Sequence, residues 1–215
     1  MTDAITTSVP FLWAARDLRN REGASLPETS NDGDEPLVRR ARGGDRQALD
    51  QLYRRHVDVI WRRLGRIIGA DPEREDLVQQ IFLEVFRGLD KFRGEAAFAT
   101  FLHRVMLNTA FDHLKRRGRR QTAPLCDESM GAPDEATSPE AAALRRERLA
   151  VSAALLDRLK PKKRIAFVLR IVEGLSLEEI GVLVGASAAT VAKRVRHAQD
   201  EIEAQLARRR RQGVA

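Results

Sequence analysis

Positively charged side chains gather at several places in this 215-residue sequence, among them Arg208–Arg211, and two of these places combine charge with other features. The first is the run KRRGRR at 115–120, which ends a stretch rich in apolar and aromatic residues. The second is the segment 187–197, where small residues are followed by Lys193, Arg194 and Arg196. Guanidinium and ammonium groups bind phosphates and guanine edges, so both segments could contact a polyanion. The alternative is that each segment is only a solvated basic face.

The distribution of charge along the chain favours the first interpretation. Residues 36–120 carry 19 basic and 11 acidic side chains, and residues 139–211 carry 16 and 9. Residues 1–35 and 121–138 are both acidic, each with a net charge of −4. Two basic blocks separated by an acidic spacer suggest two contacts with a polyanion, and nucleic acid is the commonest such partner.

Groups suited to metal binding or nucleophilic catalysis are few. Cys126 is the single cysteine, and His56, His103, His113 and His197 show no paired-ligand spacing. A nucleophile–base pair and a phosphate-binding loop are also missing. We therefore expect no metal, no cofactor and no enzymatic activity. The sequence shows neither a secretion signal nor an apolar run of membrane length, which predicts a cytoplasmic protein without membrane insertion.

The elements that would position these groups are predicted to be helices, because apolar residues recur at spacings of three and four and no alternating strand pattern appears. The predicted helices lie within residues 37–44, 46–68 (with Asp45 as its N-cap), 72–92, 97–117, 140–157, 161–173, 176–184 and 187–207. Residues 1–35 read as a mostly disordered acidic leader. The turn-rich segment 121–138 reads as a flexible linker, and 212–215 as a tail. The expected fold is all-α, with small helical domains at 36–120 and 139–211.

The predicted helix at 72–92 has an unusually wide apolar surface. Its apolar residues between Leu77 and Leu89 cover more than one face. A helix at the edge of a small bundle does not need so wide a surface. Either the helix is central and buried on several sides, or part of its surface is kept for a partner.

Residues 175–206, LSLEEIGVLVGASAATVAKRVRHAQDEIEAQL, carry the signals of a helix-turn-helix. Ser176 and Glu179 have the spacing of a capping box that begins the first helix. Gly181 is expected where the two helices cross closely. Gly185 is expected where the turn requires a positive φ.

The second helix of this motif would present a surface to DNA. Ser187 is predicted to cap it. The stripe predicted to face the core is Val191, Val195, Ala198 and Ile202. Small residues at its N-terminal end allow close approach to the major groove, and the basic residues one turn later can read guanine edges or phosphates. An ordinary helical hairpin with a basic face is the alternative.

Three segments, in this order, resemble the extracytoplasmic-function branch of bacterial sigma factors. They are DLVQQIFLEVFRGLDKF, FRGEAAFATFLHRVMLNTAFDHLKRRGRR and GLSLEEIGVLVGASAATVAKRVRHAQDEI. The resemblance covers about residues 36–207. It implies a helical bundle like sigma region 2 at 36–120 and a helix-turn-helix like sigma region 4 at 139–211. It also implies a function: an alternative sigma factor that binds core RNA polymerase, directs promoter-specific transcription initiation and helps to melt the promoter.

The same resemblance implies three sets of contact residues. Core polymerase would contact Asp76, Gln79, Gln80, Leu83 and Glu84. The minus-ten promoter element would contact Arg93, Phe98, Phe101, Arg104, Asn108, His113, Lys115, Arg116, Arg117, Arg119 and Arg120. The minus-thirty-five element would contact Ser187, Ala189, Thr190, Lys193, Arg194, Arg196 and His197. For Phe98 and Phe101, packing in the core is the alternative to base contact.

Partners also follow from the resemblance. They are the clamp helices of the largest polymerase subunit, the flap, promoter DNA and an anti-sigma factor that is released by a stress signal. Phe101 stands where the family usually has tryptophan, and Ala188-Ala189 leave fewer base-reading side chains than usual.

Two rival functions remain open at this point. A stand-alone operator-binding regulator would use the helix-turn-helix alone. An enzyme with a fused DNA-binding domain would need a cluster of His56, His103, His113 and Glu84.

Overall fold

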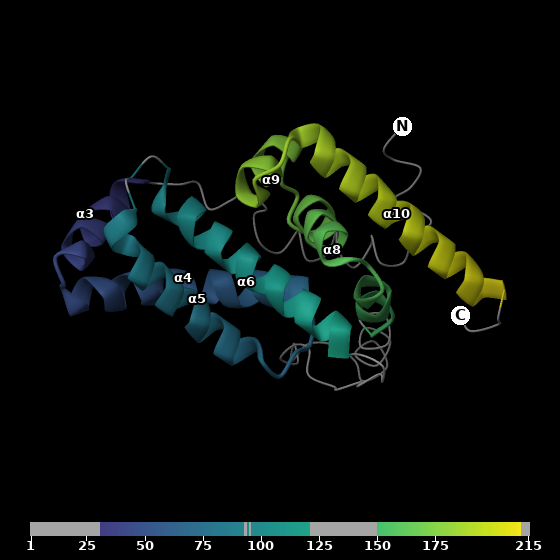
Figure 1. The fold of residues 1–215 in the computed structure, drawn as a ribbon, viewed down its shortest axis with the longest axis horizontal. Coiled ribbons are helices and arrows are strands. Elements are labelled where there is room, and N and C mark those ends of the chain that lie inside the picture. Colours follow the sequence, from purple (N-terminus) through teal and green to yellow (C-terminus); the bar gives the residue numbers. More distant parts are fainter. Residues whose placement is uncertain (1–30, 93, 95, 121–149, 212–215) are drawn as a thin grey trace, which may run out of the picture. The chain divides into compact units, whose positions relative to one another are not determined.

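The computed structural model describes residues 31–92, 94, 96–120 and 150–211 (Figure 1). Regular structure in these residues is helical, without a strand. They form two compact units, an N-terminal unit (31–120) and a C-terminal unit (150–211). The predicted all-α fold with two helical domains is therefore confirmed. Among the described residues, no helix combines the length and apolar character needed to cross a membrane.

Some predictions fall on other parts of the chain. The disorder predicted for residues 1–30, the linker at 121–138, the beginning of the helix at 140–157 and the tail at 212–215 lie outside the described residues.

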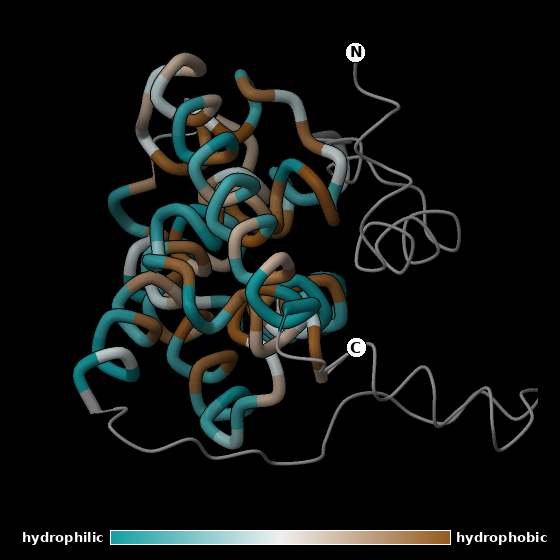
Figure 2. The backbone as a smooth tube through the Cα atoms, turned by 90° about the vertical axis from the view of Figure 1, so that its right-hand side faces the viewer, coloured by the Kyte–Doolittle hydropathy of each residue, from teal (hydrophilic) through white to brown (hydrophobic). Residues whose placement is uncertain are grey.

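The described part of the N-terminal unit contains α3 (Asn31–Arg42), α4 (Arg46–Ile68), α5 (Arg74–Gly88), the short 3-10 turn η1 (Leu89–Lys91) and α6 (Phe98–Arg120). Helices α4, α5 and α6 pack against one another, and α3 packs on α4. Asp45 caps α4 by accepting hydrogen bonds from the backbone N–H groups of Gln47 and Ala48. Each helix turns an apolar stripe inward, which Figure 2 shows as hydrophobic segments recurring between hydrophilic ones. The resulting core includes Leu52, Ile60, Ile81, Leu102 and Met106, which are fully buried.

Two helices of this unit are longer than the sequence predicts. Helix α3 begins at Asn31, although the sequence places Asp34 in the leader and starts the helical pattern at Pro36. Asp34 is buried and accepts hydrogen bonds from Arg55 and His56 of α4, which accounts for the extra turn. Pro36 is the sixth residue of α3 and removes one hydrogen bond inside the helix, a cost that the buried bonds of Asp34 to α4 offset.

The C-terminal end of α6 also extends past its predicted limit. The sequence ends this helix at Arg117 and assigns Gly118 to the linker, but the helix continues to Arg120. Arg117 donates hydrogen bonds to the carbonyl of Ile68 and to the carboxylate of Asp71, which holds the last turns against the loop after α4. This anchoring offsets the modest helix penalty of one glycine.

In the described part of the C-terminal unit, a helix at 150–157 is followed by α8 (Pro161–Phe167), the π-helical turn η2 (Val168–Val172), α9 (Leu177–Val184) and α10 (Ala188–Arg211). Helix α10 packs on α8 and α9, and Lys163 of α8 donates a 2.5 Å hydrogen bond to Glu201 of α10. The buried face of α10 consists of Val191, Val195, Ala198 and Ile202. This stripe is the one that the sequence predicts.

Candidate nucleic-acid and polymerase interfaces

The turn between α9 and α10 has the geometry of a helix-turn-helix. The Ser176 backbone N–H donates to the Glu179 carboxylate at 2.7 Å, and the Glu179 N–H donates to the Ser176 hydroxyl at 3.1 Å, so the capping box is confirmed. A Cβ added at Gly181 would lie 2.6 Å from the carbonyl oxygen of Ala186, so the close crossing is confirmed. Gly185 ends α9 in the left-handed conformation with φ of 61°, also as predicted.

Helix α10 turns its basic residues away from this packed side. The hydroxyl of Ser187 accepts a hydrogen bond from the backbone N–H of Thr190, which caps the helix as predicted. Of the residues predicted to contact the minus-thirty-five element, Arg194 is half-buried and the others are exposed: Ser187, Ala189, Thr190, Lys193, Arg196 and His197. One exposed helix face therefore combines small, hydroxylated and cationic side chains, a set suited to a major groove.

A second exposed stripe runs along α6. Phe101 is half-buried, while Arg104 and Asn108 are exposed. Their spacing of three and four residues puts them on one face of the helix. Lys115 is exposed on the same face two turns further on, and Arg116 and Arg119 are exposed nearby. Arg93 and the side chain of Arg120 lie outside the described residues.

Three residues predicted to contact the minus-ten element lie elsewhere. Phe98 is 2% exposed and His113 is 3% exposed, so both are core residues without surface to offer a base. Arg117 is half-buried and is already bonded to Ile68 and Asp71. Phe98 packs against His56 of α4, whereas His113 and Arg117 bond to Asp71 in the loop after α4. All three side chains therefore hold α6 to the rest of the unit.

His113 belongs to a buried ionic cluster. Its Nε2 lies 2.7 Å from a carboxylate oxygen of Asp71, and Arg117 reaches the same oxygen at 3.2 Å. Burial opposes ionisation of Asp71, but hydrogen bonds from His113 and from the Glu73 backbone outweigh it, and the pKa of Asp71 lies below its ordinary 3.8. The cluster therefore fastens the C-terminal half of α6 to the loop between α4 and α5.

An aromatic residue beside Phe101 was missed by sequence reasoning. Phe92 is half-buried, and its ring centroid lies 5.2 Å from that of Phe101. The sequence assigns Phe92 to the end of the preceding helix, although it directly precedes the predicted DNA-reading loop. Its position next to that loop was the signal in the sequence that could have identified it as part of the same surface.

The wide apolar surface of α5 is mostly buried within the N-terminal unit. Leu77, Val78, Ile81, Phe82 and Val85 are buried, so most of that surface belongs to a central helix. Phe86 is half-buried, and Leu83 stands out because it is 54% exposed. The polar residues predicted to contact polymerase, Asp76, Gln79, Gln80 and Glu84, are also exposed on α5, and Gln80 donates a hydrogen bond to Glu84.

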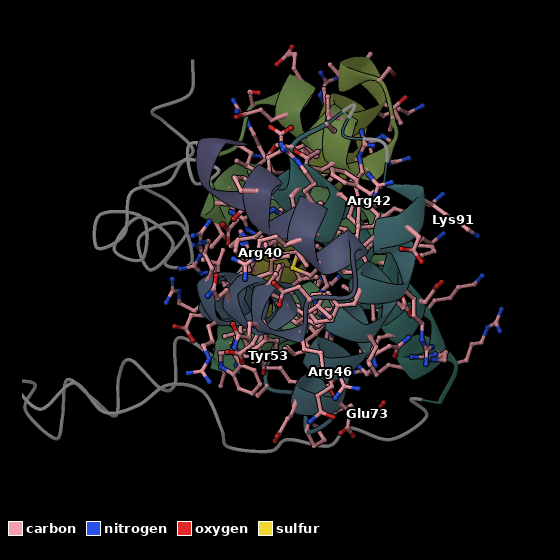
Figure 3. All side chains as sticks on the ribbon, turned by 90° about the vertical axis from the view of Figure 1, so that its left-hand side faces the viewer. Arg40, Arg42, Arg46, Tyr53, Glu73 and Lys91 are labelled. Carbon is pink, nitrogen blue, oxygen red and sulfur yellow. The ribbon has the colours of Figure 1, made fainter. Side chains whose placement is uncertain are left out.

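Exposed aromatic residues lie next to this surface on α4. Tyr53 is 37% exposed, and its ring packs edge-on against Phe82 of α5 with centroids 4.8 Å apart. Figure 3 shows Tyr53 at the surface of α4. Trp61 is 39% exposed and carries the guanidinium of Arg74 over its ring at 4.0 Å.

The histidine cluster that an enzyme would need is not assembled. His56 pairs with Asp34, His113 pairs with Asp71, and Glu84 lies on the exposed face of α5. His103 is buried in the core, where burial lowers its pKa to about 3. The described residues contain no group of side chains that could hold a metal ion.

Comparison with known proteins shows which family the chain belongs to. The model of Sigma-70 region 2 matches residues 52–120, and that of Sigma-70, region 4 matches residues 153–199. The RNA polymerase sigma-H factor of Pseudomonas aeruginosa is 35% identical over 180 residues, which cover 80% of this chain and 93% of the relative. The chain belongs to the extracytoplasmic-function branch of the sigma-70 family. As a sigma factor, it binds core RNA polymerase and directs promoter-specific transcription initiation.

Further relatives agree with this assignment. The ECF RNA polymerase sigma-E factor of Escherichia coli (strain K12) is 33% identical over 177 residues, which cover 79% of this sigma factor and 92% of the relative. A solved structure of CnrH in complex with the cytosolic domain of CnrY is similar with a TM-score of 0.55 and 26% identity. It covers 80% of this chain and 96% of CnrH.

Proposed function

We propose that this sigma factor divides promoter recognition between its two units. Residues 36–120, with the first turn of α3 that precedes them, bind polymerase and read and melt the minus-ten element. Residues 139–211 read the minus-thirty-five element, and 121–138 link the two. The observation that carries the proposal is the exposed stripe of Phe101, Arg104 and Asn108 on α6.

The stripe is suited to single-stranded DNA in its composition and order. A half-exposed aromatic ring can stack on an unpaired base, and the arginine and amide beside it can bond to base edges. Lys115, Arg116 and Arg119 then follow along α6 as exposed cations for the DNA backbone. Phe98, His113 and Arg117 are left out of this contact set and are proposed to support α6 from inside.

The exposed face of α5 is our proposed polymerase contact. Leu83 is a large apolar side chain kept in solvent among polar neighbours, an arrangement typical of the centre of a protein interface. Gln79, Gln80 and Glu84 would form its polar rim.

The proposal also covers how this sigma factor is regulated and where it works. Because the similar CnrH was solved with the cytosolic domain of CnrY, we propose that a comparable anti-sigma partner covers this sigma factor. The protein works in the cytoplasm, where its polymerase is, and acts by binding rather than by catalysis of its own.

The proposal is tested by mixing the full chain with sigma-free core polymerase and measuring binding and transcription from the promoter of its own gene. Leu83→Asp is expected to weaken polymerase binding by about tenfold or more, because a charge enters an apolar contact. Gln51→Asp adds the same charge to an exposed position of α4 and should leave binding unchanged.

The same assay separates this function from its rival. Normal polymerase binding by Leu83→Asp would contradict the α5 contact. A wild-type chain that binds operator DNA but not polymerase would instead favour the stand-alone regulator.

A further inference from the structure

A buried carboxylate at the beginning of α3 lies at one end of a continuous row of rings. Asp34 is 7% exposed, and one of its oxygens lies 2.9 Å from Nε2 of His56 on α4. Its other oxygen accepts a 2.7 Å hydrogen bond from Arg55. With partners on both oxygens, the carboxylate holds the His56 ring in one orientation.

The row continues from His56 to the surface. The ring of Phe98 packs edge-on against His56 with centroids 5.5 Å apart, and Phe92 packs edge-on against Phe98 at 6.4 Å. Phe101 lies 5.2 Å from Phe92 with the ring planes tilted by 31°. Burial decreases along the row, from fully buried Phe98 to half-buried Phe92 and Phe101.

Phe101, at the outer end of the row, packs against the backbone of α5. A Cβ added at Gly88 would lie 3.0 Å from the Phe101 ring, so this ring rests directly on the end of α5. It cannot sink further without displacing backbone. Aromatic rings that are fixed and partly exposed offer a flat face to a nucleobase at little entropic cost.

We propose that Asp34 and His56 are positioning residues for the Phe92–Phe101 ring pair, and that this pair stacks on an unpaired base of promoter DNA. The inference rests on the proposed role of α6 in reading the minus-ten element. It adds Phe92 to the reading surface and gives α3, which precedes the matched region 2 segment, a part in base recognition.

The Asp71 cluster provides a matched comparison within the same unit. Asp71, His113 and Arg117 repeat the chemistry of Asp34, His56 and Arg55. In the described part of the chain, however, no ring contact continues from His113 toward the surface. Loss of the Asp71 carboxylate should therefore weaken the fold without changing base reading.

The test is a coupling measurement between protein and DNA. Holoenzyme made from core polymerase and the full chain first selects a single-stranded oligonucleotide from a random library. Each base of the selected oligonucleotide is then removed in turn to leave an abasic site, and the affinity is measured. For the wild type, one abasic position is expected to weaken binding by about tenfold, the value of one stacked base.

In the Asp34→Asn variant, removal of that base should weaken binding by less than about twofold. The same is expected of Phe92→Ala and Phe101→Ala. Asp34→Glu, which keeps the carboxylate, should retain most of the position-specific loss. Asp71→Asn should retain all of it. A merely structural role for Asp34 would weaken binding to every oligonucleotide by the same factor and leave the tenfold loss in place.

The outcomes separate the inference from the function on which it rests. If Phe92→Ala and Phe101→Ala abolish the loss but Asp34→Asn keeps it, the positioning role is overturned and the reading surface stands. If no abasic position matters to the wild type, base reading by α6 is overturned as well. Should Asp34→Asn fail to fold, Phe98→Leu breaks the same row while keeping most of the core volume, and the same two results decide.

Discussion

The two units of this sigma factor are held together in different ways. In the C-terminal unit, the helix-turn-helix depends on neighbours in the chain: Ser176 and Glu179 cap α9, and the Ala186 N–H bonds to the Gly181 carbonyl in the turn before α10. In the N-terminal unit, α6 depends on partners far away in sequence: Asp71 and His113 are 42 residues apart. Local caps fix a short motif almost independently of its surroundings, whereas distant buried pairs make the stability of α6 depend on the whole unit.

The largest effect is expected from the distant pairs. Asp71→Ala leaves His113 and Arg117 without their shared carboxylate in a buried site, which should destabilise the N-terminal unit by about 3 kcal/mol. Denaturant unfolding followed by hydrogen exchange in each unit measures this. Asp50→Ala removes an exposed carboxylate that pairs with Arg54, and it should cost less than about 0.5 kcal/mol. Equal costs for the two variants would remove the distinction between buried and exposed pairs.

A smaller effect is expected where the C-terminal unit is most crowded. Gly181→Ala places a methyl group against the Ala186 carbonyl and should destabilise the C-terminal unit by about 2 kcal/mol. The variant should also bind minus-thirty-five DNA less tightly. Thermal unfolding and binding to duplex DNA measure the two losses. Gly118→Ala is the control, because nothing lies within 4 Å of its added methyl, and it should stabilise α6 slightly. Unchanged stability in Gly181→Ala would contradict the close crossing.

Acid should weaken the N-terminal unit through its two buried carboxylates. Burial opposes ionisation of Asp34 and Asp71, but their hydrogen bonds outweigh it, so the pKa of each lies below the ordinary 3.8 in the folded chain. The unfolded chain therefore binds protons first as the pH falls. This stabilisation is present in full above about pH 5 and is lost as the pH drops through the folded-state values. Hydrogen exchange across this range should show the N-terminal unit weakening, and Asp34→Asn with Asp71→Asn should flatten that dependence.

The smallest effect is expected at the local cap. Ser176→Ala removes one side-chain acceptor from the first turn of α9 and should destabilise the C-terminal unit by about 1 kcal/mol. Chemical denaturation measures this cost. Ser152→Ala removes a buried hydroxyl from the helix at 150–157 of the same unit, so it should weaken the unit as a whole rather than the first turn of α9. Hydrogen exchange of the α9 backbone is compared between the two variants. An equal increase in both would argue against a local role for the cap.

The same contrast explains what the sequence could predict. The capping box, Gly185 and the inward stripe of α10 follow from residues within a few positions of one another, and each was predicted correctly. For Phe98 the sequence left core packing open as the alternative to base contact, and the structure shows that it is buried. The burial of His113 could not be predicted, because it depends on Asp71, which only the fold brings near. The first turn of α3 was missed for the same reason, since the bonds of Asp34 to α4 outweigh its turn-like composition.

The most direct test of the central claim measures strand opening in the holoenzyme. Permanganate reactivity of unpaired thymines reports opening, while polymerase binding and duplex minus-thirty-five binding are measured in parallel. With Arg104→Ala and Asn108→Ala combined, we expect opening to fall by roughly tenfold to a hundredfold while both other activities persist. Gln51→Ala with Arg54→Ala removes the same chemical groups from exposed sites on α4 and should open promoters normally. Wild-type opening in the α6 variant would contradict the account.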